Sequence, residues 1–338
     1  MIRFALAALA AFGSAATAQT PPQPLFASDA PLHLTIRGAV SEVASSHRRD
    51  VTRAATLGVV GGESEPVMLS PRGITRLRRD VCQFAPLRVD FTSRLAAPSL
   101  FAGQKRLKLV THCRAFEGYQ QKLLLEYAAY RMYNLLTPLS LRARLAMIDY
   151  TGSDGRLLTS RYGFFLEDLG DTGRRNGLAE GRAGERIAQA SLSPADAARF
   201  AVFEYMISNF DWSMVAGPRG DVCCHNGRLL QRGVTYVPVP YDFDYSGLID
   251  APYALPPVGI PVASVRQRRY RGYCRHNAEA LQVVADLRAK RGALLAVFGQ
   301  VPGINPRTSA KAIAFLDGFF NNIADDRSAA ATMLKTCL

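Results

Sequence analysis

Residues 107–136 read LKLVTHCRAFEGYQQKLLLEYAAYRMYNLL, a short β-like run followed by a long helical one. The first seven residues, LKLVTHC, have the alternating, β-branched character of a strand. From residue 117 onward the large side chains recur at helical spacing: Leu123, Tyr127, Tyr130 and Asn134. Pro138 lies just beyond the predicted helix end. The chain therefore passes here from a sheet into one long helix.

Similar short runs flank this segment on both sides, and each is bounded by glycine, proline or charged residues. They cover residues 32–38, 66–70, 86–91, 142–150 and 160–169. Residues 151–155, TGSDG, separate the last two and are typical of a hairpin turn. We expect antiparallel strands and one helix to form a β-rich N-terminal lobe over residues 31–169.

Helical patterns dominate after a glycine- and arginine-rich stretch at residues 170–185. Ser193-Pro194-Ala195-Asp196 predicts a capped helix start, and that helix should run to about Ser208. Residues 276–299 and 308–335 also have helical patterns. We therefore predict a mostly helical C-terminal lobe over residues 170–338, and an α+β fold class.

The N-terminus has the features of a signal peptide over residues 1–18. Arg3 precedes an apolar run, and Ala16-Thr17-Ala18 supplies an A-x-A cleavage site. The run is too short for a membrane-spanning helix, which needs about 20 residues. Residues 19–30, rich in Pro, Gln and Ala, predict a flexible leader. We expect an exported protein, periplasmic or extracellular, with no transmembrane segment after signal removal.

The cysteines fit export, because an even count in an oxidising compartment favours disulfides. The six are Cys82, Cys113, Cys223, Cys224, Cys274 and Cys337. They allow up to three bridges, and we expect Cys82 to pair with Cys113 because each lies beside a predicted strand. A zinc site at Cys223-Cys224-His225 is disfavoured, because adjacent cysteines lack the C-x2-C spacing.

The formal net charge is +13, and removal of Arg3 with the signal peptide leaves 13 − 1 = +12. A basic surface of this kind suits anionic partners such as phosphates or acidic polymers. An ordinary basic protein from an arginine-rich proteome explains the charge equally well. The sequence has no nucleic-acid-binding motif, so we predict no specific nucleic-acid partner.

Two acids in residues 240–247, PYDFDYSG, are the strongest sign of chemistry. Asp242 and Asp244 leave a probable strand and would point to the same side of an extended backbone. Magnesium takes oxygen ligands, often one or two carboxylates together with substrate phosphates. The alternative, an acidic surface turn, is disfavoured because Tyr241 and Phe243 flank Asp242. We predict Asp242 and Asp244 as metal ligands.

Asp211 ends the predicted helix beside Trp212, the only tryptophan. An acid at a helix C-terminus is electrostatically disfavoured, which points to a compensating role. Asn226 lies between this acid and Asp242 and offers an amide oxygen to a metal.

Lys108 lies within a predicted strand, and Glu126 lies in the helix that follows. A strand lysine paired with a helix glutamate positions ATP phosphates in kinases. A snorkelling lysine and an exposed glutamate are an equally good interpretation of these two residues alone.

Together these segments resemble the CotH family of spore-coat kinases across roughly residues 65–250. The resemblance rests on five segments: an Arg-Gly turn (70–73), a basic strand (86–91), a core strand with its helix (107–136), a hinge-like strand (162–169) and PYDFDYSG (240–247). The resemblance implies a two-lobed protein-kinase-like fold that uses ATP with Mg2+ or Mn2+.

Residue by residue, the resemblance implies Asp211 as the catalytic acid that orients or deprotonates an acceptor hydroxyl. It implies Asn226 and Asp242 as metal ligands. It also implies three nucleotide contacts: Lys108 on the phosphates, Glu126 holding that lysine, and the backbone near Glu167 facing the adenine.

The predicted function is that of an exported kinase-like protein, which transfers a phosphoryl group from a metal-bound nucleotide to a protein or envelope hydroxyl. One alternative is a non-catalytic pseudokinase that binds an anionic envelope polymer or a partner protein. A metal-dependent phosphoesterase is a weaker alternative, because the five histidines include no H-x-H or H-x-x-H pair. The sequence also lacks the G-x-S-x-G of a serine hydrolase.

Overall fold

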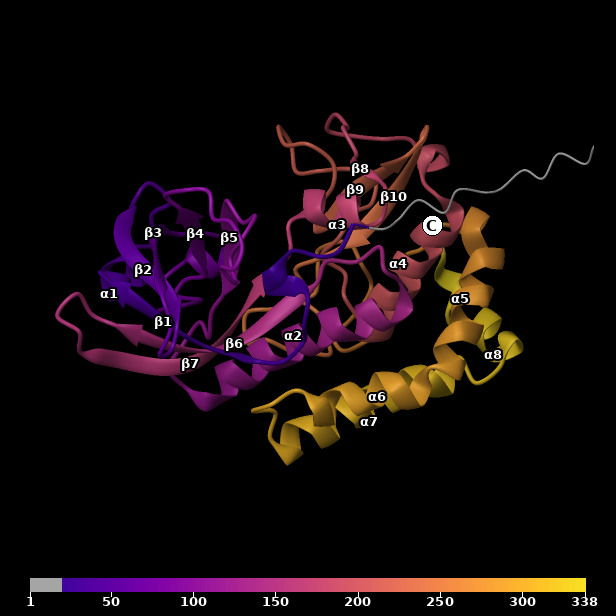
Figure 1. Cartoon of the computed structure of the whole chain (residues 1–338). Helices are drawn as coiled ribbons and strands as arrows, with labels where there is room; N and C mark the ends of the chain where they lie inside the picture. The colour runs from indigo at the N-terminus through magenta and orange to yellow at the C-terminus, as the bar shows by residue number, and fades with distance from the viewer. Residues whose placement is uncertain (1–19) are drawn as a thin grey trace, which may run out of the picture.

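The computed structural model describes residues 20–338 and has a β-barrel at one side and helices at the other (Figure 1). The predicted signal peptide, residues 1–18, lies outside the described residues. Residues 20–30, in the segment predicted as a leader, contain the 3-10 helix η1 (Pro24–Phe26). Leu25 and Phe26 are buried there.

Seven strands form a closed barrel in the order β1-β2-β3-β4-β5-β7-β6. The strands are β1 (Leu32–Gly38), β2 (Arg53–Val59), β3 (Ser64–Pro71), β4 (Leu87–Phe91), β5 (Arg106–Val110), β6 (Ala143–Thr151) and β7 (Leu157–Leu166). Neighbours pair antiparallel except β1 and β6, which are parallel, with Leu32 opposite Ala146 and Arg37 opposite Thr151. This parallel pairing closes the barrel.

The prediction of a two-lobed protein-kinase-like fold with a β-rich N-terminal lobe is wrong, because the strands close into this barrel. The predicted strands are present in the barrel, and β2 is an additional one. Alternation identifies a strand, but it does not say which strands pair across the barrel. Side chains such as Leu34, Leu57 and Ile148 are fully buried in the barrel core.

Helix α2 (Glu117–Leu136) has the bounds predicted from the spacing of its large side chains. It runs past the lower side of the barrel toward α4 (Pro194–Ile207), as Figure 1 shows. Twelve of its side chains are buried, including those of Glu126 and Tyr130. The helix therefore links the barrel core to the helical part of the molecule.

The remaining elements form a small sheet and a group of helices. The sheet has the order β10-β9-β8, formed by β8 (Ala179–Glu180), β9 (Gly227–Arg232) and β10 (Thr235–Pro240). The helices are α3 (Leu169–Arg175), α5 (Asn277–Ala289), α6 (Arg291–Gln300), α7 (Pro306–Asn322) and α8 (Asp326–Thr332), and a short helix α1 (Val40–Ser45) packs against the barrel. The two C-terminal helices predicted from sequence are each divided in two, as α5 with α6 and α7 with α8. Across residues 20–338, no helix combines the length and apolar character that a membrane span requires.

The cysteines form three disulfides, and the predicted pair Cys82–Cys113 is confirmed. Cys274 pairs with Cys337 near the C-terminus. The neighbours Cys223 and Cys224 pair with each other at the edge of the cavity described below.

Candidate functional site

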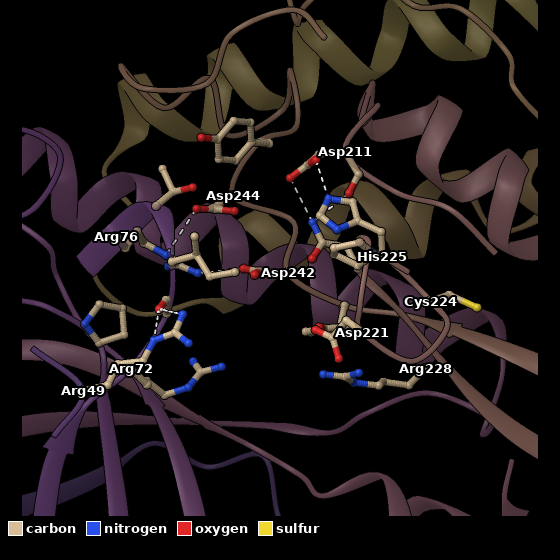
Figure 2. Close-up of a pocket in the computed structure, with 18 of the residues that line it drawn as sticks. Arg49, Arg72, Arg76, Asp211, Asp221, Cys224, His225, Arg228, Asp242 and Asp244 are labelled. Atoms are coloured by element: carbon tan, nitrogen blue, oxygen red, sulfur yellow. Dashed lines mark hydrogen bonds and ion pairs between the residues drawn. The ribbon is translucent and has the colours of Figure 1, made fainter. Parts of the chain in front are cut away.

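A cavity of about 560 Å3 lies where the loops of the barrel meet the segments around β9 and β10 (Figure 2). The barrel contributes residue 49, residues 71–76 and residues 86 and 88. The rest of the lining comes from residue 211, residues within 218–228, and residues 241, 242, 244 and 245. The cavity therefore joins segments that are far apart in sequence.

Two residues that line this cavity have unusual backbone conformations. Asn226 and Asp242 have positive φ values of 46° and 65°. Such conformations in residues other than glycine concentrate at functional sites, where the surrounding structure holds them in place. The backbone N–H of Asp242 donates to the Tyr130 hydroxyl over 2.8 Å, so α2 fixes the start of the acidic segment.

Arg76, in the 3-10 helix η2 (Thr75–Leu77), organises the acidic side of the cavity. Its guanidinium contacts Glu126 at 3.0 Å, Asp242 at 2.8 Å and Asp244 at 3.2 Å. Burial raises the pKa of Glu126 and of Asp244. Burial opposes the charge on Arg76, but the Asp244 and Glu126 carboxylates raise the pKa of Arg76 well above its usual value. Arg76 therefore forms ion pairs with all three carboxylates.

The two acids of the PYDFDYSG segment differ in exposure. Asp244 is buried and also accepts a hydrogen bond from the Tyr253 hydroxyl at 3.0 Å. The Asp242 side chain is 35% exposed at the cavity and contacts Arg76 through Oδ1. Of the two, Asp242 is the carboxylate that a ligand in the cavity would meet.

Asp211 forms a second polar group on the same cavity wall. Its Oδ1 lies 2.6 Å from Nε2 of His225, and its Oδ2 accepts from the Asn226 amide at 3.0 Å. The hydrogen bond to Asp211 raises the pKa of His225, although burial opposes this. The backbone N–H of Asp211 donates to Asn209, which also accepts from the indole of Trp212. The Asp211 carboxylate is therefore oriented from both sides while its side chain stays 38% exposed.

Two cations lie against the ring of Tyr241, and a third, Arg72, lies near them. Arg228 lies 4.8 Å and Lys108 6.0 Å from the ring centroid. Burial is the main cause that lowers the pKa of Lys108 to about 8, and the positive charges of Arg72 and Arg228 contribute to the same shift. Within residues 20–338, none of the three side chains has a carboxylate partner within ion-pair distance. Figure 2 shows Arg72 and Arg228 on the opposite side of the cavity from Asp211.

The structure brings four of the predicted site residues to one cavity: Asp211, Asn226, Asp242 and Asp244. Lys108 lies next to this cavity through its contact with Tyr241. Glu126 pairs with Arg76 rather than with Lys108. Glu167 is buried outside the cavity lining, and its carboxylate contacts Arg175 at 2.9 Å.

Sequence analysis missed Arg76, Arg228 and the hydrogen bond of His225 to Asp211. Arg76 follows Arg72 by four residues, but arginine is common throughout the chain, so this spacing carried no signal. His225 was considered only together with the cysteines before it. Its position next to Asn226 was the one available clue.

The donor atoms on the acidic wall fit a hard divalent cation. The second oxygen of Asp242 contacts no described hydrogen-bond donor, and Asn226 uses its amide N–H toward Asp211, which leaves its amide oxygen as a ligand. The described residues contain no group of three His, Cys, Asp or Glu side chains placed to hold a metal by themselves. This donor set fits magnesium held by one or two protein groups together with ligand phosphates.

Fold and site define a seven-stranded barrel protein with a cavity that is arginine-rich on one wall and acidic on the other. No protein-family model matches the chain, and no curated protein matches it significantly.

Proposed function

We propose that the protein is an exported phosphotransferase that moves a phosphoryl group from a metal-bound nucleoside triphosphate to a hydroxyl. The observation that carries this proposal is the group of Arg72, Lys108 and Arg228. No carboxylate of residues 20–338 lies within ion-pair distance of these cations, and they lie in or next to the cavity that Asp211 and Asp242 line. Partly buried cations without a counter-ion favour a ligand rich in negative charge. The three disulfides support export, because disulfides persist in oxidising compartments.

The cationic wall would bind the phosphates of the donor. Arg72 and Arg228 offer guanidinium groups, which suit phosphate oxygens by charge and by paired donors. Lys108 adds a compact charge next to them. A divalent cation held by Asp242 and Asn226 would neutralise phosphate charge. Positioning and charge stabilisation of this kind account for most of the catalysis of phosphoryl transfer.

Asp211 would act on the acceptor. The new bond forms between the acceptor oxygen and the terminal phosphorus, and the bond from that phosphorus to the bridging oxygen of the donor breaks. The acceptor proton moves to the Asp211 carboxylate, and the nucleoside diphosphate leaves. His225 and Asn226 hold Asp211 in one orientation, which general base catalysis requires.

A non-catalytic anion-binding protein is the second candidate. One observation favours it: Arg76 already neutralises part of the charge of Asp242, the residue that would hold the metal. Such a protein would bind polyanions through Arg72, Lys108 and Arg228 without needing a metal.

A transfer assay separates the two candidates. The oxidised protein is incubated with terminally labelled ATP and either Mg2+ or Mn2+, and label on the protein, on added serine peptides and in free phosphate is measured. Metal-dependent transfer supports the phosphotransferase if Arg72→Met lowers its rate. Arg53→Met is the control, because Arg53 lies outside the cavity lining and pairs with Glu42, and it should leave the rate unchanged. Metal-independent nucleotide binding without any transfer would leave the anion-binding protein as the better account.

The pKa of Lys108 predicts a pH dependence of nucleotide binding. A phosphate ligand prefers the protonated lysine, and with a pKa of about 8 that form is dominant at pH 7 and minor at pH 9. The dissociation constant should therefore rise roughly tenfold over this range. Arg72 and Arg228 oppose protonation, and Asp168 and Asp242 favour it. Titration calorimetry at several pH values should show a flatter profile for Lys108→Met, and an equally steep one would refute the assignment.

A further inference from the structure

A second, smaller cavity of about 110 Å3 opens beside Asp211. It is lined by Phe210, Asp211, Tyr245, Leu255, Pro257 and Val265. Asp211 and Tyr245 also line the large cavity. The two cavities therefore share Asp211, the residue to which the proposed function assigns the acceptor proton, and Tyr245.

The lining of the small cavity differs sharply from that of the large one. Apart from Asp211 and the hydroxyl of Tyr245, its lining residues are apolar, and no lysine or arginine of residues 20–338 lines it. Leu255 is 71% exposed, and the neighbouring Val258 is fully exposed. Single exposed apolar residues are ordinary, but here they border an apolar hollow next to a candidate catalytic acid.

Two anchors hold the far walls of this small cavity in place. The carbonyl of Val265 accepts from the Ser208 hydroxyl at 2.7 Å, which ties the wall to the end of α4. The carbonyl of Phe210 accepts from the Arg271 guanidinium at 2.6 Å. The cavity is therefore formed by segments that are bonded to the helical core rather than by the exposed loop alone.

The size of the cavity limits what it holds. An apolar cavity of about 150 Å3 accepts a molecule such as benzene. A cavity of about 110 Å3 suits one branched aliphatic side chain. Because the walls are apolar, filling the cavity with such a side chain removes apolar surface from water and stabilises the complex.

We propose that this cavity is the acceptor subsite and that the acceptor is a peptide serine or threonine with a branched aliphatic residue beside it. This inference rests on the proposed function, which places the acceptor hydroxyl at Asp211. The aliphatic neighbour would fill the space between Leu255 and Val265 while the donor phosphates occupy the basic cavity. The assignment explains why a basic cavity and an apolar one share a single carboxylate.

The test compares two serine peptides that differ only in the residue beside the serine, leucine in one and aspartate in the other. Wild type should prefer the leucine peptide in kcat/KM by roughly tenfold or more, the range that a small apolar contact supplies. Leu255→Asp should abolish this preference. Val258→Asp lies in the same loop but outside the lining, and it should keep the preference.

The outcomes separate the inference from the function on which it rests. Equal use of both peptides by a wild type that transfers phosphate would overturn the subsite and leave the phosphotransferase standing. Preference for a long-chain alcohol over both peptides would overturn the peptide assignment in the same way. Absence of any nucleotide-dependent shift in melting temperature and of any transfer would overturn both proposals.

Discussion

Replacing Arg76 by methionine should lower the free energy of unfolding by about 3–5 kcal/mol, the usual cost of removing one partner from a buried ion pair. Arg76 is buried and holds Glu126, Asp242 and Asp244 together. Without it, two buried carboxylates lose their only cation within ion-pair distance among the described residues. Burial already raises the pKa of Glu126 and Asp244, so both acids should take up protons in the variant.

Urea unfolding at pH 7 measures this loss. Arg78→Met is the matched control, because Arg78 lies two residues away and forms an exposed pair with Asp80. The control should unfold at the same urea concentration as wild type, since exposed pairs contribute little. Because the acids protonate more readily at low pH, the deficit of Arg76→Met should shrink between pH 7 and pH 5. A variant as stable as wild type at pH 7 would show that Arg76 does not hold the acidic cluster together.

Asp211→Asn should lower the rate of phosphoryl transfer by about 10²- to 10⁴-fold, the range that general base catalysis contributes. The amide keeps the shape of the side chain but cannot take the acceptor proton. The side chain is 38% exposed, so the fold should tolerate the change. Nucleotide binding should persist, because the phosphates are assigned to Arg72, Lys108 and Arg228 on the opposite wall.

The control for this variant is Asp221→Asn, which alters an exposed acid that also lines the cavity. Single-turnover rates with saturating ATP and a serine peptide compare the two variants directly. Asp221→Asn should transfer at nearly the wild-type rate. If Asp211→Asn kept the wild-type rate while binding nucleotide normally, Asp211 would not be the base.

Local patterns predicted the elements well, because the residues that define each element lie close together in sequence. The spacing of large side chains gave α2 its bounds, and the turn residues between β6 and β7 marked a hairpin. Closure of the barrel could not be predicted in this way, because β1 pairs with β6 across more than a hundred residues. For the same reason β9, which pairs with β10 on one side and β8 on the other, was not predicted.

The site residues, like the fold, were predicted only where the signal was local in sequence. Asp211, Asn226 and Asp242 were predicted from their chemistry and share one cavity. The partner of Glu126 was predicted from the kinase arrangement as Lys108, but Arg76 occupies that place through a loop between β3 and β4. Which cation reaches a buried acid depends on how loops meet in space, and the sequence around either residue does not contain that information.

The most direct test of the phosphotransferase proposal is whether ATP with Mn2+ stabilises the oxidised protein, measured as the change in free energy of unfolding. At a ligand concentration 100 times the dissociation constant, the account predicts stabilisation of about 2.7 kcal/mol. Arg72→Met and Asp242→Asn should each weaken this stabilisation, and Arg53→Met should preserve it. No stabilisation of wild type by ATP with Mn2+ or with Mg2+ would contradict the account.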